Sequence, residues 1–252
     1  MNVLLSGIGG HMGHEVATLA RSGYRGAVLT FGFDPYFDGE CDVPVCRSLD
    51  EVPEDAPIDC IIDFSHHSAA ADVAKYAVET GCAMVVGTTG HTEEEKSAIY
   101  AAAKIVPVFY TGNMSLGIAV LCNLAKQTAQ SFPDADIEIV EIHHNRKVDA
   151  PSGTAKMLFE AVKEVHPKAT ANCGRAGEGK RQPGEIGIQA LRMGNVVGIH
   201  EVHITTATQQ ISLRHEAFDR GMFADGAVEA AKFLQGKPAG HYTMADLLEE
   251  SR

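Results

Sequence analysis

Two histidines, an arginine and a lysine lie close together in the segment 141–154, which reads EIHHNRKVDAPSGT. A histidine can donate a proton near neutral pH, and the neighbouring cations can hold an anion. The Pro-Ser-Gly-Thr sequence is typical of a helix start, where Ser152 caps the helix and backbone N–H groups can bind a carboxylate or a phosphate. The segment therefore predicts a site that binds a small anion and protonates it.

The chain as a whole is acidic: 33 Asp and Glu residues against 21 Lys and Arg residues give a formal net charge of −12. Nucleic acid is therefore excluded as the expected partner, because binding its backbone needs a broad positive surface. The six cysteines form no CxxC pair, which argues against a zinc ribbon or a redox motif. No stretch is long and apolar enough to span a membrane, so we expect a soluble, cytoplasmic protein without a membrane partner.

The N-terminal segment has the pattern of a strand, a glycine turn and a helix. An apolar strand at 3–5 leads into SGIGGHMG at 6–13, after which apolar residues recur at helical spacing. The turn departs from GxGxxG because Met12 occupies the third glycine position, and its glycines are better described as Gly7, Gly10 and Gly13. Such a turn can be purely structural. Followed by a helix, it predicts dinucleotide binding.

Asp34 bears on which dinucleotide is bound. It ends a second predicted strand at 27–33, about 20 residues beyond the turn, where a Rossmann fold places the acid that binds the ribose diol. A carboxylate there repels the 2′-phosphate of NADP, and no arginine or lysine directly follows it. His11 and His14 are the nearest basic residues of the turn. We therefore expect NADH to be preferred, or NADH and NADPH both to be used.

Strands and helices then alternate up to residue 110, which predicts a parallel sheet. The expected strands are 59–64, 83–86 and 106–110, and the expected helices are 68–79 and 92–104. Ligands bind beyond the carboxyl ends of such strands. Those ends carry Gly7, Asp34, Phe64, the loop 87–90 and Gly112.

After Asn113 the pattern changes to that of a second, mainly β domain. We expect helices at 115–130 and 152–165, a strand at 137–142, a loop at 173–185, and strands at 186–192, 196–205 and 209–216. The open face of this sheet would need cover from another layer or subunit. The helix expected at 222–235 is placed back on the first sheet, which still needs helices on one face.

The predicted fold class is thus α/β. A Rossmann-like, parallel-sheet dinucleotide domain at 1–114, completed by 222–252, precedes an α+β substrate-binding and oligomerisation domain at 115–221 with an open, mainly β sheet.

The histidines have other interpretations. His143, His144 and Glu141 could ligate a metal, but Arg146 and Lys147 would repel a divalent cation. Neighbouring strand residues also point to opposite faces. No metal is therefore expected. A structural or surface role is expected for the remaining histidines singled out, His66, His67, His200 and His203.

Together, four motifs resemble those of the 4-hydroxy-tetrahydrodipicolinate reductase (dihydrodipicolinate reductase) family, and the resemblance covers nearly the whole chain. They are the turn GIGGHMG at 7–13, GTTG at 87–90, NMS at 113–115 and the specific signature KVDAPSGT at 147–154. The resemblance implies NAD(P)H-dependent reduction of 4-hydroxy-tetrahydrodipicolinate in the diaminopimelate route to lysine. It also implies a homotetramer assembled through the β-rich domain.

Site residues follow from the resemblance position by position. His143 is implied as the proton donor and Lys147 as a second catalytic group. The implied substrate ligands are His144, Ser152, Gly153 and Thr154. The implied cofactor contacts are Gly7, Gly10, His11, Met12, Asp34, Gly87, Thr88, Thr89, Gly112, Asn113 and Met114. The family often has arginine in its glycine turn where this chain has His11 and His14, which weakens the case for NADPH.

Two alternative functions remain open from the residues. One is an NADH-dependent reductase acting on another small dicarboxylate. The other is a catalytically silent NADH-sensing protein, in which the basic segment would bind a regulatory anion.

Overall fold

The computed structural model describes residues 1–250 and divides the chain into two compact units. One unit comprises Met1–Ser115 together with the C-terminal segment that begins at Gly221, and the other is Leu116–Arg220. No helix in the described part of the chain is long and apolar enough to cross a membrane.

The first unit is built on a seven-stranded parallel sheet with the order β12-β6-β5-β4-β1-β2-β3. Its strands are β1 (Asn2–Ser6), β2 (Val28–Phe33), β3 (Val45–Cys46), β4 (Cys60–Asp63), β5 (Ala83–Val86), β6 (Pro107–Tyr110) and β12 (Gly240–Tyr242). Every residue of β4 and β5 is buried. Continuous burial of this kind is typical of parallel strands that are covered on both faces.

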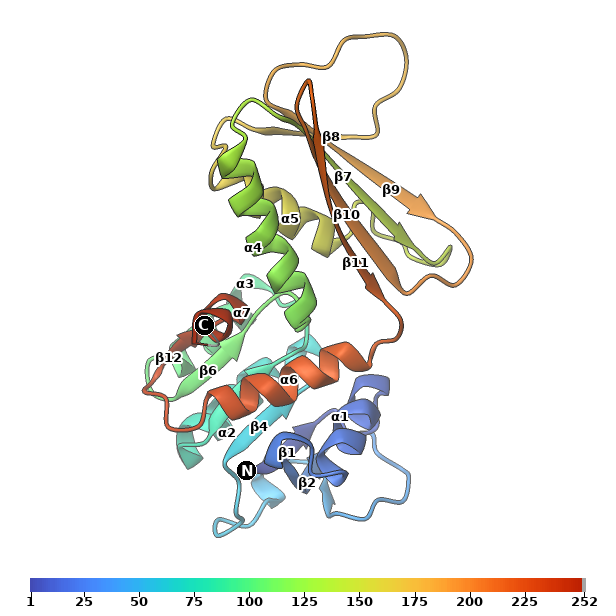
Figure 1. Cartoon of the computed structure of the whole chain (residues 1–252). Helices are drawn as coiled ribbons and strands as arrows, with labels where there is room; N and C mark the ends of the chain where they lie inside the picture. Colours follow the sequence, from blue (N-terminus) through green and yellow to red (C-terminus); the bar gives the residue numbers. More distant parts are fainter. Residues whose placement is uncertain (251–252) are drawn as a thin grey trace. The chain divides into compact units, whose positions relative to one another are not determined.

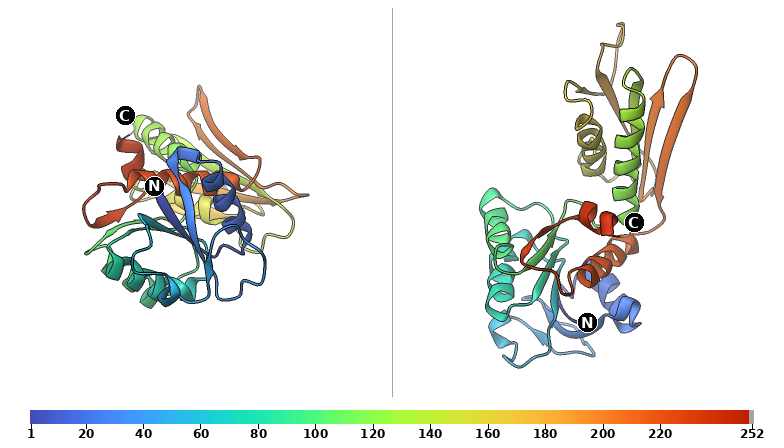
Figure 2. Two further views of the ribbon diagram at one scale, coloured as in Figure 1. Left: turned by 90° about the horizontal axis from the view of Figure 1, so that it is seen from below. Right: turned by 60° about the vertical axis from the view of Figure 1, so that its left-hand side comes forward.

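Helices cover both faces of this sheet (Figure 2). They are α1 (His11–Arg21), α2 (Ala70–Thr80), α3 (Glu93–Ala102), α6 (Gly221–Phe233) and α7 (Met244–Glu250). Helix α2 packs against α3 on one face, and α1 packs against α6 on the other. A capping box defines the start of α3, because the Thr92 and Glu95 side chains bond each other's backbone N–H groups.

The second unit contains a mixed five-stranded sheet with the order β11-β10-β7-β9-β8 (Figure 1). Its strands are β7 (Asp136–His143), β8 (Thr170–Cys173), β9 (Glu185–Arg192), β10 (Gly198–Thr205) and β11 (Gln210–Ala217). Helices α4 (Leu116–Ser131) and α5 (Gly153–Lys163) pack on one face of the sheet and form the core with it. No helix of this unit covers the opposite face. The predicted fold class, a Rossmann-like parallel sheet followed by an open, mainly β sheet, is confirmed.

Three short strands were not expected from the sequence, namely β3, β8 and β12. Strands β3 and β12 have two and three residues, which is too short for a periodic pattern to be recognised. Strand β8 has four residues, like β4, but its sequence TANC is mostly exposed and lacks the apolar residues that mark a buried strand. Each of the three is an edge strand and is defined by hydrogen bonds to a longer neighbour. The segment 174–184, expected as part of a loop, contains no helix or strand.

Candidate functional site

The glycine turn of the first unit leaves no room for side chains. Gly7 follows β1 with φ +79°, a conformation that favours glycine. A Cβ added at Gly13 would lie 2.2 Å from the carbonyl oxygen of Gly7. Helix α1 begins directly after Gly10, and no side chain caps its first turn. The turn is therefore suited to close approach by a phosphate group toward the helix N-terminus.

Asp34 is held against this turn at the end of β2. Its carboxylate accepts hydrogen bonds from the backbone N–H groups of Gly9 (3.1 Å) and Tyr36 (3.0 Å). Parallel pairing of β1 with β2 brings the two segments together. The arrangement fits a dinucleotide whose pyrophosphate lies at the turn and whose ribose lies by Asp34.

A cation that is distant from Asp34 in the sequence lies on the loop after it. The guanidinium of Arg47 donates to the carbonyl of Phe37 at 3.1 Å. Strand β3, which pairs with β2, brings Arg47 there from 13 positions beyond Asp34 in the sequence. Local sequence around Asp34 therefore understates the positive charge in this loop.

The loops at the carboxyl edge of the sheet are tied together by Asp63, which sequence reasoning missed. Its buried carboxylate accepts from the hydroxyls of Ser6 (2.7 Å), Ser65 (2.5 Å) and Thr88 (2.5 Å). These residues end or follow β1, β4 and β5. The recurrence of short hydroxyl side chains at strand ends is the signal that could have identified Asp63.

The expected cofactor contacts lie on the loops and on the first turn of α1 at this one edge of the sheet. His11 and Met12 open α1, while Gly87, Thr88 and Thr89 follow β5. Gly112, Asn113 and Met114 follow β6, where the side chain of Asn113 accepts from the backbone of Ser115. Met114 is buried, and a Cβ at Gly226 of α6 would overlap its carbonyl oxygen, so this loop is packed closely on α6.

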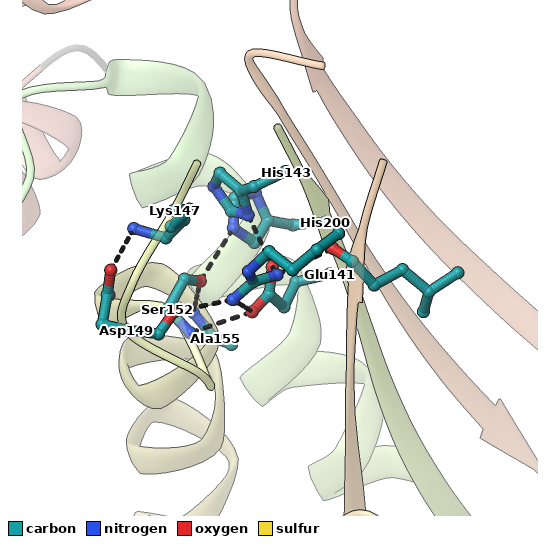
Figure 3. A network of polar contacts seen from close by, with 9 residues as sticks. Glu141, His143, Lys147, Asp149, Ser152, Ala155 and His200 are labelled. Carbon is teal, nitrogen blue, oxygen red and sulfur yellow. Dashed lines mark hydrogen bonds and ion pairs between the residues drawn. The ribbon is translucent and has the colours of Figure 1, made fainter. Parts of the chain in front are cut away.

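In the second unit, the alternating burial of β7 places Glu141 and His143 on the same inward face. Glu141 is completely buried, and His143 is 9% exposed. The Glu141 carboxylate accepts from His143 Nδ1 at 2.5 Å and from the backbone N–H of Ser152 at 3.0 Å (Figure 3). Arg192 of β9 binds both carboxylate oxygens, at 2.8 and 2.9 Å. A buried ionic cluster thus lies at the end of β7.

The charge state of Glu141 follows from these contacts. Burial alone would raise its pKa, but hydrogen bonds from His143, Arg192 and Ser152 outweigh burial and lower the pKa to about 2. Glu141 is therefore ionised near neutral pH and has no proton to donate. The hydrogen in its contact with His143 must belong to Nδ1.

His200 of β10 lies beside this cluster. It is opposite Glu141 in the β10–β7 pairing, and its ring centroid is 5.1 Å from that of His143. Its Nε2 is 3.3 Å from the hydroxyl of Ser152. Burial, and secondarily the charge of His143, lowers the pKa of His200 to about 3. The sequence offered no reason to place it near His143, since only strand pairing brings the two together.

We expect His200 to make stability depend on pH. Its pKa is lowered on folding from an ordinary 6.5, so the unfolded chain binds a proton that the folded chain refuses between about pH 6.5 and about pH 3. The free energy of unfolding should fall across that window as pH falls, by up to about 1.4 kcal/mol per pH unit. Urea unfolding of His200→Gln should show a weaker dependence, whereas His203→Gln, on the other face of β10, should match the parent. Equal slopes for all three proteins would contradict this role of His200.

The remaining residues of the signature surround the first turn of α5. Lys147 Nζ lies 2.7 Å from a carboxylate oxygen of Asp149, and this contact lowers the pKa of Asp149. His144 follows β7 and is half-buried. Its pKa is lowered by burial and by the nearby cations Arg146 and Arg220. Histidine, lysine and helix start are therefore all parts of one unit.

Ser152, also expected as a substrate ligand, is the N-cap residue of α5. It is 2% exposed, its N–H donates to Glu141, and its Oγ accepts from the N–H of Ala155 at 3.2 Å. Both its N–H and its hydroxyl oxygen thus form hydrogen bonds within the protein, and Ser152 acts as the cap of α5. Gly153 is exposed, and a Cβ added to it would meet nothing within 4 Å. The accessible part of the helix start is thus Gly153 and the residue after it.

Comparison with known proteins accounts for both units. Residues 1–114 match the family model described as dihydrodipicolinate reductase, N-terminus, and residues 117–248 match dihydrodipicolinate reductase, C-terminus. The chain is 42% identical over 252 residues to a 4-hydroxy-tetrahydrodipicolinate reductase of Caldanaerobacter subterraneus, covering 99% of each chain. It is 39% identical to one of Alkaliphilus oremlandii, covering 98% of each. Its fold is similar to that of a dipicolinate-bound dihydrodipicolinate reductase from Paenisporosarcina, with a TM-score of 0.80, 22% identity and coverage of 98% and 99%.

Proposed function

The chain belongs to the dihydrodipicolinate reductase family, and from this premise we propose which of its residues carry out each part of the reaction. The activity is the pyridine-nucleotide-dependent reduction of 4-hydroxy-tetrahydrodipicolinate to tetrahydrodipicolinate in lysine biosynthesis. The observation that best supports the assignment of residues is the buried 2.5 Å contact of Glu141 with His143, at the end of the strand that leads into Lys147 and α5.

The nucleotide is held by the loops at the carboxyl edge of the first sheet. The first turn of α1 faces the pyrophosphate, and Asp34 binds the adenosine ribose. The loops after β5 and β6, from Gly87 to Thr89 and from Gly112 to Met114, complete the contacts. When bound, the reduced nucleotide supplies a hydride.

The substrate is a dicarboxylate, and the second unit offers groups that bind such an anion. Backbone N–H groups at Gly153 and Thr154 hold one carboxylate, while Lys147 and His144 provide charge-assisted hydrogen bonds to the substrate. The solved relative from Paenisporosarcina binds dipicolinate, which is also a dicarboxylate, and this supports an anion site.

Protonation is assigned to Nε2 of His143. Loss of the 4-hydroxyl group as water gives the conjugated dihydrodipicolinate ring. Hydride addition to this ring then leaves negative charge on it, and a proton must be delivered to carbon. Nδ1 is engaged by Glu141, so Nε2 is the nitrogen that carries the transferable proton. Lys147 stabilises the negative charge that develops on the ring.

NADH is the preferred nucleotide, or both nucleotides are used, because Asp34 repels a 2′-phosphate while Arg47 attracts it. We expect Asp34→Ser to raise the ratio of kcat/KM for NADPH to that for NADH by about tenfold or more, since removing one close charge repulsion is worth about 1.4 kcal/mol or more. Steady-state kinetics with both nucleotides measures the ratio. Asp38→Ser, four positions along the same loop, is the control. An unchanged ratio in Asp34→Ser would remove this residue from nucleotide selection.

A homotetramer formed through the uncovered face of the second sheet is the proposed assembly, and the cytoplasm is the proposed location. Partly buried apolar side chains lie on that face at Val140 and Ile142, next to the charged Glu138 of the same strand, and an uncovered sheet face of this kind is suited to contact with another subunit. Sedimentation equilibrium of the purified protein would give the number of subunits.

The activity is tested by following NADH oxidation with the purified protein and freshly generated 4-hydroxy-tetrahydrodipicolinate. Oxidation that depends on this substrate is the expected result. Oxidation with other small dicarboxylates but not with this one would favour the first alternative reductase. Nucleotide binding without turnover of any of them would favour a sensing protein.

A further inference from the structure

We propose that Glu141 is a positioning residue that fixes the orientation and tautomer of His143, with Arg192 balancing its charge. The inference rests on the proposed role of His143 as proton donor. It adds the reason why one ring nitrogen, and not the other, would face the substrate.

The geometry leaves the Glu141 side chain no freedom. One carboxylate oxygen accepts from Ser152 N and from Arg192, and the other accepts from Arg192 and from His143 Nδ1. Each oxygen is therefore held by two donors. A histidine ring bonded to such a fixed acceptor is itself fixed in angle, and its Nδ1 must carry hydrogen.

The other ring nitrogen, Nε2, lies beside Gly198 of the neighbouring strand β10, which has no side chain. A Cβ added to Gly198 of β10 would lie 3.2 Å from His143 Nε2, so the absence of a side chain at Gly198 keeps that side of Nε2 uncovered. The ring of His200 packs against His143 edge to face. His143 is thus held on its Nδ1 side and on one ring side, while Nε2 is left for proton transfer.

The charges around His143 allow the proposal to be tested, because they predict in which direction each substitution shifts the pH dependence of kcat. Glu141 is negative and lies two residues before His143 on β7, and Arg192 is positive and lies opposite His143 on β9. Lys147 and Asp149 form a second pair, from the loop after β7. His200 is neutral near pH 7, and the pKa values of His144 and of His215 on β11 are lowered by burial. Removing Glu141 or Arg192 therefore changes the net charge beside His143 in opposite directions.

The first test is direct and needs no activity. In ¹⁵N-histidine-labelled protein, with His143 assigned by the loss of its signals in His143→Gln, we expect hydrogen on Nδ1 with a strongly downfield proton resonance. That resonance should disappear in Glu141→Gln and persist in Glu185→Gln. The control is matched, because Glu185 is also a buried carboxylate paired with an arginine, Arg175, but at the opposite end of β9. A His143 with hydrogen on Nε2 only would overturn the proposal.

The second test compares the pH dependence of kcat in Glu141→Gln and Arg192→Met. If protonated His143 is required, losing the carboxylate should move the alkaline fall of kcat to lower pH, and losing the guanidinium should move it to higher pH. At pH 8 Glu141→Gln should lower kcat by about tenfold or more, the usual effect of removing an orienting partner, with a smaller change in KM. Shifts in the same direction, or none, would show that Glu141 and Arg192 only stabilise the fold.

The outcomes separate this inference from the proposed function. If His143→Gln retains turnover, the proton-donor role fails whatever the tautomer is. If His143→Gln is impaired while Glu141→Gln behaves like Glu185→Gln in both tests, the donor role stands and the positioning role of Glu141 is wrong. Should Glu141→Gln fail to fold, two results still test the positioning role of Glu141. These are the Nδ1 proton resonance of His143 in the unsubstituted protein and the direction in which Arg192→Met shifts the alkaline fall of kcat.

Discussion

Replacing His143 with glutamine should lower kcat by roughly 10²-fold or more, the range that general acid catalysis contributes. Glutamine keeps a polar group at the end of β7 and can still bond Glu141, so the core should remain folded. It cannot deliver a proton to carbon near neutral pH. A loss of 10² corresponds to about 2.7 kcal/mol of transition-state stabilisation. KM should change less, because His143 is assigned to the proton and not to the carboxylates.

Single-turnover measurements with NADH and substrate are the decisive readout, because slow product release can hide a change in the chemical step. His166→Gln is the matched control. His166 follows the C-terminal end of α5, opposite to the end that carries Ser152, and its Nε2 donates to the carbonyl of Ala129 at 3.1 Å. A parent-like rate in His143→Gln would remove His143 from proton transfer.

Replacing Lys147 with alanine should impair both binding and turnover. The Lys147 side chain is 22% exposed and its ammonium contacts the Asp149 carboxylate, so it is already oriented before α5. A hydrogen bond to a charged partner contributes about 1.5–3 kcal/mol, and kcat/KM should therefore fall by about 10- to 100-fold. Part of the loss should appear in KM, from the ground-state carboxylate, and part in kcat, from charge that develops on the ring.

Two further variants show whether a loss of activity in Lys147→Ala comes from the missing charge at this position. Lys163→Ala removes a lysine from the last turn of α5, about 15 Å along the helix axis from Gly153, and should leave kinetics unchanged. Lys147→Arg keeps the charge but changes its shape, and should recover part of the affinity and less of kcat. Unchanged affinity and turnover in Lys147→Ala would exclude it from the site.

The sequence alone was sufficient for the elements whose patterns are local. The turn at Gly7 to Gly13 was recognised because positive φ and close packing demand glycine there. The start of α5 was recognised because Ser152 is a capping residue followed by an apolar helical period. The segment 141–154 was recognised because its histidines, cations and helix start are contiguous. Such features depend on neighbouring residues, and so they can be recognised without knowing the fold.

Only the tertiary structure decided what surrounds these features. Arg192 reaches Glu141 from 51 positions away because β7 pairs with β9 in parallel, in a register that sets His143 opposite Arg192. The β10–β7 pairing in the same way places His200 opposite Glu141. Strand pairing depends on which apolar faces pack together across the whole unit, and no local pattern records it. The physical reason is that charge state and orientation are set by contacts between distant segments. The sequence therefore determined which side chains could take part in the reaction. The fold determined which of their atoms are available for it, as with Nε2 of His143, because Nδ1 is bonded to Glu141.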